Sequence, residues 1–208
     1  GPVDRKIFKD LSEFATDEEE QKELLRLSTK EAASDIELMK QEYVNVLDIM
    51  EEFKSIELTP AVLLQLIPKM MPRYYTIASS SKLSPTKVRI VISLTSVTSK
   101  KGKKFNGLTS HYFDRLFKEH FENKDGSEIT SRIFIKDSLF KMPVDQKTPL
   151  IMIGPGTGIA PFIAFSEERQ YYKENQSDIE LGNSTLYFGC KQRDHDYIYR
   201  DELAKFKE

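Results

Sequence analysis

The chain has 208 residues, of which 39% are hydrophobic and 31% charged, so it can bury a substantial core in one or two domains. No apolar run approaches the roughly 20 residues of a membrane span, and no signal peptide is visible, so we expect no membrane segment in this chain. A single Cys and three widely spaced His exclude a disulfide framework and a metal-ligand motif. These features predict a reducing compartment, on the cytoplasmic side of any membrane.

The charge is unevenly distributed along the chain. Residues 1–72 carry 9 Lys and Arg against 16 Asp and Glu, a net charge of −7, whereas residues 73–208 carry the remaining 22 against 17, a net charge of +5. The basic part suits phosphorylated small ligands, but its charge is too small and too mixed to predict nucleic-acid binding.

Residues 8–72 are predicted to be helical. Thr16 with Glu19 and Ser34 with Glu37 have the spacing of capping boxes. Apolar residues at three- and four-residue spacing in the second segment indicate core packing: Ile36, Met39, Tyr43, Val46, Leu47, Met50 and Phe53. Thr59 and Pro60 start a short helix that ends at Pro68. No catalytic constellation stands out in this part.

Strand patterns begin at Arg73. Residues 73–78 and 88–94 alternate as β-strands do, residues 100–104 predict a lysine-rich hairpin turn, and residues 133–135 predict a further strand. Asn106 to Ser110 combines glycine and hydroxyl residues before an amphipathic helix over residues 111–120. Such a helix start is a second anion site in principle.

The most informative stretch is residues 148–168. An apolar strand at 150–153 has the composition of a buried parallel strand, and it runs into Gly154-Pro155-Gly156-Thr157-Gly158. A helix follows from about Thr157, with residues 167–169 expected on its exposed side. Unpaired N–H groups and a positive helix end suit a phosphate, although glycines needed only for packing are the alternative.

Two common nucleotide motifs are excluded at this loop. A P-loop would need Gly and Lys where the chain has Ile159 and Ala160, and the G-x-G-x-x-G fingerprint would need a third glycine at Ile159. A second strand at 184–188 and a helix over 199–207 complete the pattern of a parallel α/β unit.

Four ordered motifs together resemble the diflavin reductases, over nearly the whole chain. The motifs are Arg73-Tyr74-Tyr75-Thr76-Ile77-Ala78-Ser79-Ser80, Gly107-Leu108-Thr109-Ser110, the run from Gly154 to Phe162, and Tyr187 to Lys191 followed by Asp196 to Leu203. The resemblance implies a mixed α and β fold in three parts. These are a helical connecting region over 1–72, part of an antiparallel FAD-binding β-barrel over 73–147, and the start of a parallel α/β NADP-binding domain over 148–208.

The resemblance also implies a set of cofactor-binding residues. Arg73 would pair with the FAD pyrophosphate, Tyr75 would stack on the isoalloxazine beside Tyr74, and the Thr76 hydroxyl would face flavin N5 as the catalytic group. The remaining expected FAD contacts are Val91, Ile92, Ser93, Gly107, Leu108, Thr109 and Ser110. The expected NADP contacts are Gly156, Thr157, Gly158, Cys190 and Lys191, with Cys190 not a catalytic residue and no metal ligand among them.

By the same resemblance the chain is an FAD-dependent NADPH oxidoreductase module that passes electrons to an FMN domain or haem-protein acceptor. FMN would lie on a domain outside these 208 residues, and the chain is expected to be a fragment that turns over slowly. Val97 and Tyr43 depart from the residues common in the family. The alternative is a non-catalytic remnant that binds a nucleotide or a partner, and a plain dinucleotide dehydrogenase would leave the Arg73 and Gly107 motifs without a purpose.

Overall fold

The structure is a computed structural model that describes residues 3–99, 102–122, 128–176 and 178–206. It confirms a mixed α and β fold, with one short antiparallel and one short parallel sheet and no closed barrel among the described residues. The chain divides into two compact units, residues 1–72 with 96–107, and residues 73–95 with 108–208. None of the described helices has the length and apolar character that a membrane span requires.

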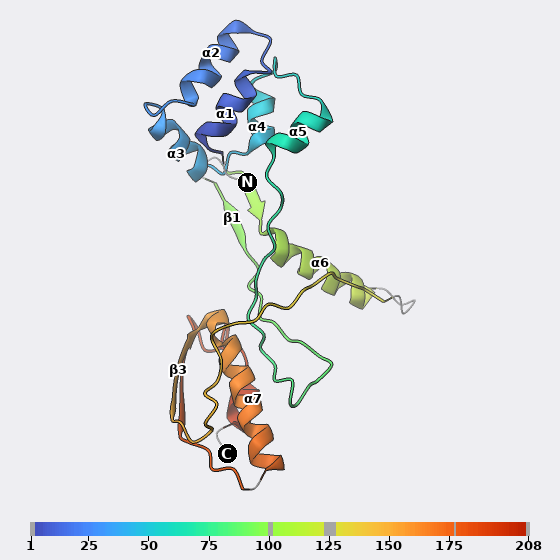
Figure 1. The fold of residues 1–208 in the computed structure, drawn as a ribbon, viewed down its shortest axis with the longest axis vertical. Helices are drawn as coiled ribbons and strands as arrows, with labels where there is room; N and C mark the ends of the chain where they lie inside the picture. The colour runs from blue at the N-terminus through green and yellow to red at the C-terminus, as the bar shows by residue number, and fades with distance from the viewer. Residues whose placement is uncertain (1–2, 100–101, 123–127, 177, 207–208) are drawn as a thin grey trace. The chain divides into compact units, whose positions relative to one another are not determined.

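The first unit is mainly helical, as predicted (Figure 1). Its helices are α1 (Arg5–Ser12), α2 (Glu18–Leu27), α3 (Ala33–Gln41), α4 (Val46–Glu52) and α5 (Pro60–Leu66). A hairpin of β1 (Ser96–Thr98) and antiparallel β2 (Lys104–Asn106) belongs to the same unit. The predicted turn at 100–104 lies between these strands, with Gly102 at φ 82°, and residues 100 and 101 are outside the described residues.

The helices of this unit share one hydrophobic core. Phe8, Leu11 and Leu24 are fully buried where α1 and α2 pack together. The whole core consists of Val3, Ile7, Phe8, Leu11, Leu24, Leu27, Ala32, Ile36, Ile49, Phe53 and Ile56. Helix α5 buries none of its residues, although its predicted start is confirmed because Thr59 Oγ1 accepts the Val62 N–H at 3.3 Å.

The two predicted capping boxes are wrong. Helix α2 is capped by Asp17, whose carboxylate accepts the N–H groups of Glu19 and Glu20, while Thr16 donates its hydroxyl to the Ser55 carbonyl. Helix α3 starts after Ala32 without a side-chain cap. A capping box does occur at α4, between Asn45 and Asp48.

The continuous apolar stripe over residues 36–53 is also corrected. Tyr43 takes a left-handed conformation, with φ 57°, and this turn separates α3 from α4. Ile36 and Phe53 are buried, whereas Tyr43 and Leu47 are 42% and 62% exposed. The three- and four-residue spacing therefore does not describe one helical face, because the turn interrupts the helix phase.

The second unit contains α6 (Leu108–Glu122), β3 (Leu150–Pro155), the 3-10 turn η1 (Gly156–Ile159), α7 (Ala160–Asn175), β4 (Ser184–Gly189) and α8 (Arg200–Lys205). Strands β3 and β4 are parallel and in register from Leu150 beside Ser184 to Pro155 beside Gly189. Helix α7 lies against this sheet (Figure 1). The predicted strands, turn and helices of the parallel unit are thus confirmed.

Burial on β3 follows the strand alternation and corrects the expected fully buried strand. Met152 is 5% exposed on the face that α7 covers, while Ile151 and Ile153 on the other face are 76% and 68% exposed. In a two-stranded sheet with its described helix on one side, only alternate residues can be buried.

The strands predicted before α6 are largely absent. Of residues 73–78 and 88–94, only Ile77 and Ile90 pair, in an isolated antiparallel bridge. Residues 133–135 form no strand and their side chains are 60% to 72% exposed. A strand needs a hydrogen-bonded neighbour, and within the described ranges these alternating runs have none beyond the single bridge.

Candidate functional site

The glycine turn after β3 has open space beside two of its glycines. Gly156 has φ 53°, and a Cβ placed there would meet no atom within 4 Å. A Cβ on Gly158 would come no closer than 3.7 Å to a neighbour, Pro155 Cδ. No side chain caps η1, and the turn leads directly into the N-terminus of α7. The space and the backbone N–H groups fit a phosphate.

Gly154 has a different purpose. A Cβ at this position would lie 2.8 Å from the Gly158 carbonyl oxygen, 2.9 Å from Ile159 Cα and 2.9 Å from Phe162 Cδ2. Gly154 therefore allows the strand to pack closely on the turn and helix. The packing alternative weighed from the sequence is correct for Gly154, whereas Gly156 has the positive φ that favours glycine and Gly158 has no close neighbour.

The loop after β4 lies beside this turn, because Pro155 pairs with Gly189 at the same end of the sheet. Cys190 and Lys191 follow Gly189 directly, and Cys190 is exposed. The Asp196 carboxylate accepts the N–H groups of Gln192 at 2.7 Å and Lys191 at 2.8 Å, and these bonds hold the pKa of Asp196 below its usual value. All five residues predicted to contact NADP thus gather at one edge of the sheet.

Two of the expected FAD runs are brought together by a hairpin. The bridge between Ile77 and Ile90 places the end of the 73–76 run next to the start of the 91–93 run. The Ala78 N–H reinforces it by donating to the Arg89 carbonyl at 2.8 Å. Among these residues Arg73, Thr76 and Ser93 are exposed, while Tyr75, Val91 and Ile92 are half-buried.

The third expected FAD run begins α6. The Thr95 N–H donates to Ser110 Oγ at 3.3 Å, and Ser110 is 5% exposed. This bond joins the end of the 91–95 segment to the first turn of the helix, where Leu108 and Thr109 also lie. Gly107, the first residue of this run, is assigned to the other compact unit.

The Tyr74 ring contacts one aromatic ring and one cationic side chain. Its ring is 5.7 Å from the Phe134 ring in an edge-to-face arrangement, and Lys136 Nζ lies 5.2 Å from the centre of the Tyr74 ring. The ring remains 63% exposed. Residues 133–135, which were predicted to form a strand and do not, therefore contribute the Phe134 side chain to the surroundings of Tyr74.

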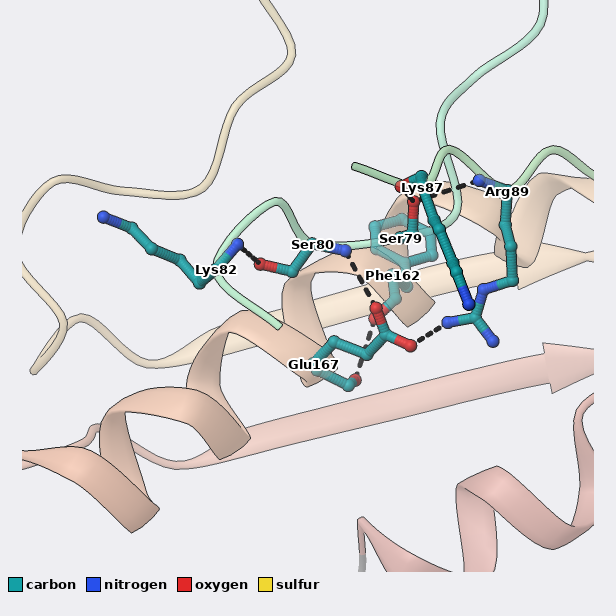
Figure 2. A network of polar contacts seen from close by, with 8 residues as sticks. Ser79, Ser80, Lys82, Lys87, Arg89, Phe162 and Glu167 are labelled. Atoms are coloured by element: carbon teal, nitrogen blue, oxygen red, sulfur yellow. Dashed lines mark hydrogen bonds and ion pairs between the residues drawn. The ribbon is translucent and has the colours of Figure 1, made fainter. Parts of the chain in front are cut away.

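Glu167 links the hairpin to α7, a role that was not predicted from the sequence. Figure 2 shows the Glu167 carboxylate between Ser80 and Arg89. Its side chain is only 13% exposed, which corrects the expected exposed position. The signal was present, because Glu167 follows the buried residues Ala160 and Ile163 at helical spacing.

Arg169 is likewise buried rather than exposed, at 9%. Its guanidinium donates to the carbonyls of Gln146 and Gly182, so it joins the loops that precede β3 and β4. Burial lowers the pKa of Arg169. This residue supports the end of the sheet opposite the glycine turn and belongs to the scaffold.

Comparison with known proteins agrees with this arrangement. A family model described as an FAD binding domain matches residues 1–112, and one described as an oxidoreductase NAD-binding domain matches residues 152–208. Since the first match covers more than half of the chain, the chain belongs to the FAD-binding domain family. The second match covers β3 from Met152 onward, the glycine turn and the loop after β4, so the two matched families bind FAD and a nicotinamide dinucleotide, respectively.

The relatives that the chain resembles include NADPH--cytochrome P450 reductases and a diflavin oxidoreductase, in agreement with the resemblance of the four motifs to diflavin reductases. The chain is 36% identical over 205 residues to NADPH--cytochrome P450 reductase of Drosophila melanogaster, covering 96% of this chain and 29% of the relative. It is 38% identical over 206 residues to NADPH-dependent diflavin oxidoreductase 1 of Dictyostelium discoideum, covering 98% and 32%. The human NADPH--cytochrome P450 reductase is 34% identical over 209 residues, covering 99% and 30%. The chain thus spans about 30% of the length of these relatives.

Proposed function

We propose that the chain is an FAD-containing NADPH oxidoreductase module that carries electrons from NADPH to an FMN domain or a haem-protein acceptor. The observation that carries the proposal is that the hairpin around the Ile77–Ile90 bridge and the open glycine turn at 156–158 belong to one compact unit. The chemistry supplied by bound FAD is acceptance of a hydride from NADPH and release of single electrons. The protein's residues bind and orient the two cofactors.

On the flavin side, Arg73 is our candidate for the FAD pyrophosphate and Tyr75 for stacking on the isoalloxazine. Thr76 is our candidate for the hydroxyl nearest the reacting flavin nitrogen. The exposed positions of Arg73 and Thr76, and the half-buried Tyr75, support these roles because a bound ligand can reach them. Val91 to Ser93 and Gly107 to Ser110 complete the proposed FAD contacts.

On the nucleotide side, Gly156, Thr157 and Gly158 are proposed to hold the NADPH phosphates, with Cys190 and Lys191 beside them. The open space over Gly156 and the pairing of Pro155 with Gly189 support this assignment. Phe188 stacks on Tyr197 at 5.3 Å, which stiffens the loop that carries Cys190 and Lys191.

We also propose a division into a connecting region at 1–72, part of the FAD-binding barrel at 73–147, and the start of the NADP-binding domain at 148–208. The separate core of α1 to α4 supports the first part. The Ile77–Ile90 bridge supports a barrel origin for the segment that contains it, whereas the antiparallel β1–β2 pair belongs to the helical unit. The proposed partner is an FMN domain or flavodoxin-like protein that meets the acidic 1–72 region.

Titration of the apoprotein with FAD tests this function. We expect a yellow complex, and we expect Tyr75→Ala to weaken FAD binding by about 1 kcal/mol or more, about fivefold in Kd. Tyr75→Phe is the matched control because it keeps the ring, and it should bind FAD nearly as well as the wild type.

Two results would count against this proposal. A colourless protein whose absorbance FAD does not change would support the alternative of a non-catalytic remnant. Equal FAD affinity for Tyr75→Ala and Tyr75→Phe would remove the stacking role.

A further inference from the structure

The Glu167 carboxylate joins two parts of the second unit that are distant in sequence. One oxygen accepts the Ser80 N–H at 2.8 Å, and the other pairs with the Arg89 guanidinium (Figure 2). Ser80 and Arg89 lie on opposite arms of the 77–90 hairpin. A single side chain on α7 therefore contacts both arms.

The hairpin itself is held by local hydrogen bonds. Ser79 Oγ accepts the Arg89 N–H at 3.0 Å, and the Ser80 hydroxyl accepts the Lys82 N–H at 3.2 Å. Ala78, Ser79 and Ser80 are 0%, 7% and 3% exposed. The Ser80 end of the contact is therefore shielded from water, where a charge-assisted hydrogen bond is stronger than at the surface.

A second contact supports the same placement. The Arg89 guanidinium lies 5.9 Å from the centre of the Tyr199 ring, just before α8. Burial raises the pKa of Tyr199. Arg89 thus bridges the Glu167 carboxylate and the start of α8.

We propose that Glu167 is a positioning residue that fixes the spacing between the flavin-contacting run 73–76 and the glycine turn 156–158. The proposal rests on the function proposed above. Ser80 is four residues from Thr76, and Glu167 lies on the helix that starts at the glycine turn. Hydride transfer requires the two reacting atoms to be held at close contact, and a misplacement of about 1 Å can slow such a step about 100-fold.

The first test measures this spacing without cofactors. The single native cysteine, Cys190, and Thr86→Cys on the exposed hairpin loop accept spin labels on the full chain. We expect a narrow distance distribution in the otherwise wild-type protein, a broader one with Glu167→Gln, which keeps only the Ser80 bond, and the broadest with Glu167→Ala. Glu168→Ala is the matched control on the neighbouring residue, whose contact is with Tyr172 on the same helix.

The second test uses protein with its native Cys190 and reconstituted FAD. We expect Glu167→Ala to slow flavin bleaching by saturating NADPH about tenfold or more, while Kd for FAD and KM for NADPH change less than about twofold. Arg89→Met removes the same ion pair as Glu167→Gln and, in addition, the contact with the Tyr199 ring, so the double variant should exceed Glu167→Gln only by the effect of losing that ring contact.

The two tests separate the two proposals. A distance distribution for Glu167→Ala as narrow as that of the wild type overturns the positioning role, whatever the flavin does. A slowed reaction explained entirely by weaker FAD binding overturns it as well. Failure of the wild-type protein to bind FAD overturns the proposed function, and the distance measurement still decides the role of Glu167.

Discussion

Alanine substitutions in the glycine turn can distinguish the glycine needed for packing, Gly154, from a glycine proposed to contact a ligand, Gly158. In Gly154→Ala the new Cβ would come within 2.8 Å and 2.9 Å of backbone atoms of Gly158 and Ile159, which cannot move without shifting the turn. Overpacking of this kind costs about 1–3 kcal/mol. In Gly158→Ala the nearest atom is 3.7 Å away, so the free energy of unfolding should change by less than about 0.5 kcal/mol.

Amide hydrogen exchange is the suitable assay because it measures the local stability of the second unit independently of the first unit. The Leu150 N–H, which donates to the Asn183 carbonyl at 2.8 Å, marks the start of the β3–β4 sheet. Its exchange should become faster in Gly154→Ala and stay unchanged in Gly158→Ala. NADPH titration should give the reverse order, with binding weakened in Gly158→Ala despite its intact sheet. Equal protection in both variants, or full NADPH affinity in Gly158→Ala, would refute this account of the turn.

Two further predictions concern the helical unit. Glu20 accepts hydrogen bonds from the Ser55 hydroxyl at 2.7 Å and the Ser55 N–H at 2.9 Å, which hold its pKa below 4.5. Glu20 therefore binds a proton more readily in the unfolded state, so the stability that these hydrogen bonds contribute is present above pH 4.5 and is lost as the pH falls through the lower folded pKa. The difference in urea midpoint between the wild type and Glu20→Gln should shrink from pH 7 to pH 3.5. A difference that stays constant with pH would contradict this role of Glu20. Leu24→Ala should lower the free energy of unfolding by about 2–5 kcal/mol, whereas Leu64→Ala, at a position 79% exposed, should change it by less than about 0.5 kcal/mol, as urea unfolding followed by circular dichroism would measure.

Features with a short-range cause were predictable from the sequence. The Thr59-Pro60 helix start, the helix after Gly107 and the strand, turn and helix around Gly156 each depend on residues within a few positions of one another. The glycine turn was therefore located as a candidate ligand site. Only the structure distinguishes Gly154, where a Cβ would clash, from Gly156 and Gly158, where a Cβ would have space.

Features with a long-range cause were not predictable in the same way. Glu167 pairs with Arg89 from 78 residues away and accepts the Ser80 N–H from 87 residues away. No local pattern identifies such partners, and residues 167–169 were expected on the exposed side of the helix, although the helical spacing of Glu167 from Ile163 is that of an inward-facing residue. The strands expected at 73–78 and 88–94 failed for a related reason, since alternation describes a side chain's face but does not supply a hydrogen-bonded neighbour.

The two compact units are interleaved along the chain, which crosses between them after residues 72, 95 and 107. During synthesis the helices emerge before the β1–β2 hairpin, and their unit gains the Lys103–Asp48 ion pair only when that hairpin has been made. The contacts of the 77–90 hairpin with Glu167 likewise form only after α7 has been made. Contacts between such distant positions slow folding, because a long loop must close before they form. Expression of residues 1–72 alone would therefore separate the helices from the hairpin that completes their unit, and a division after residue 107 would keep that unit whole.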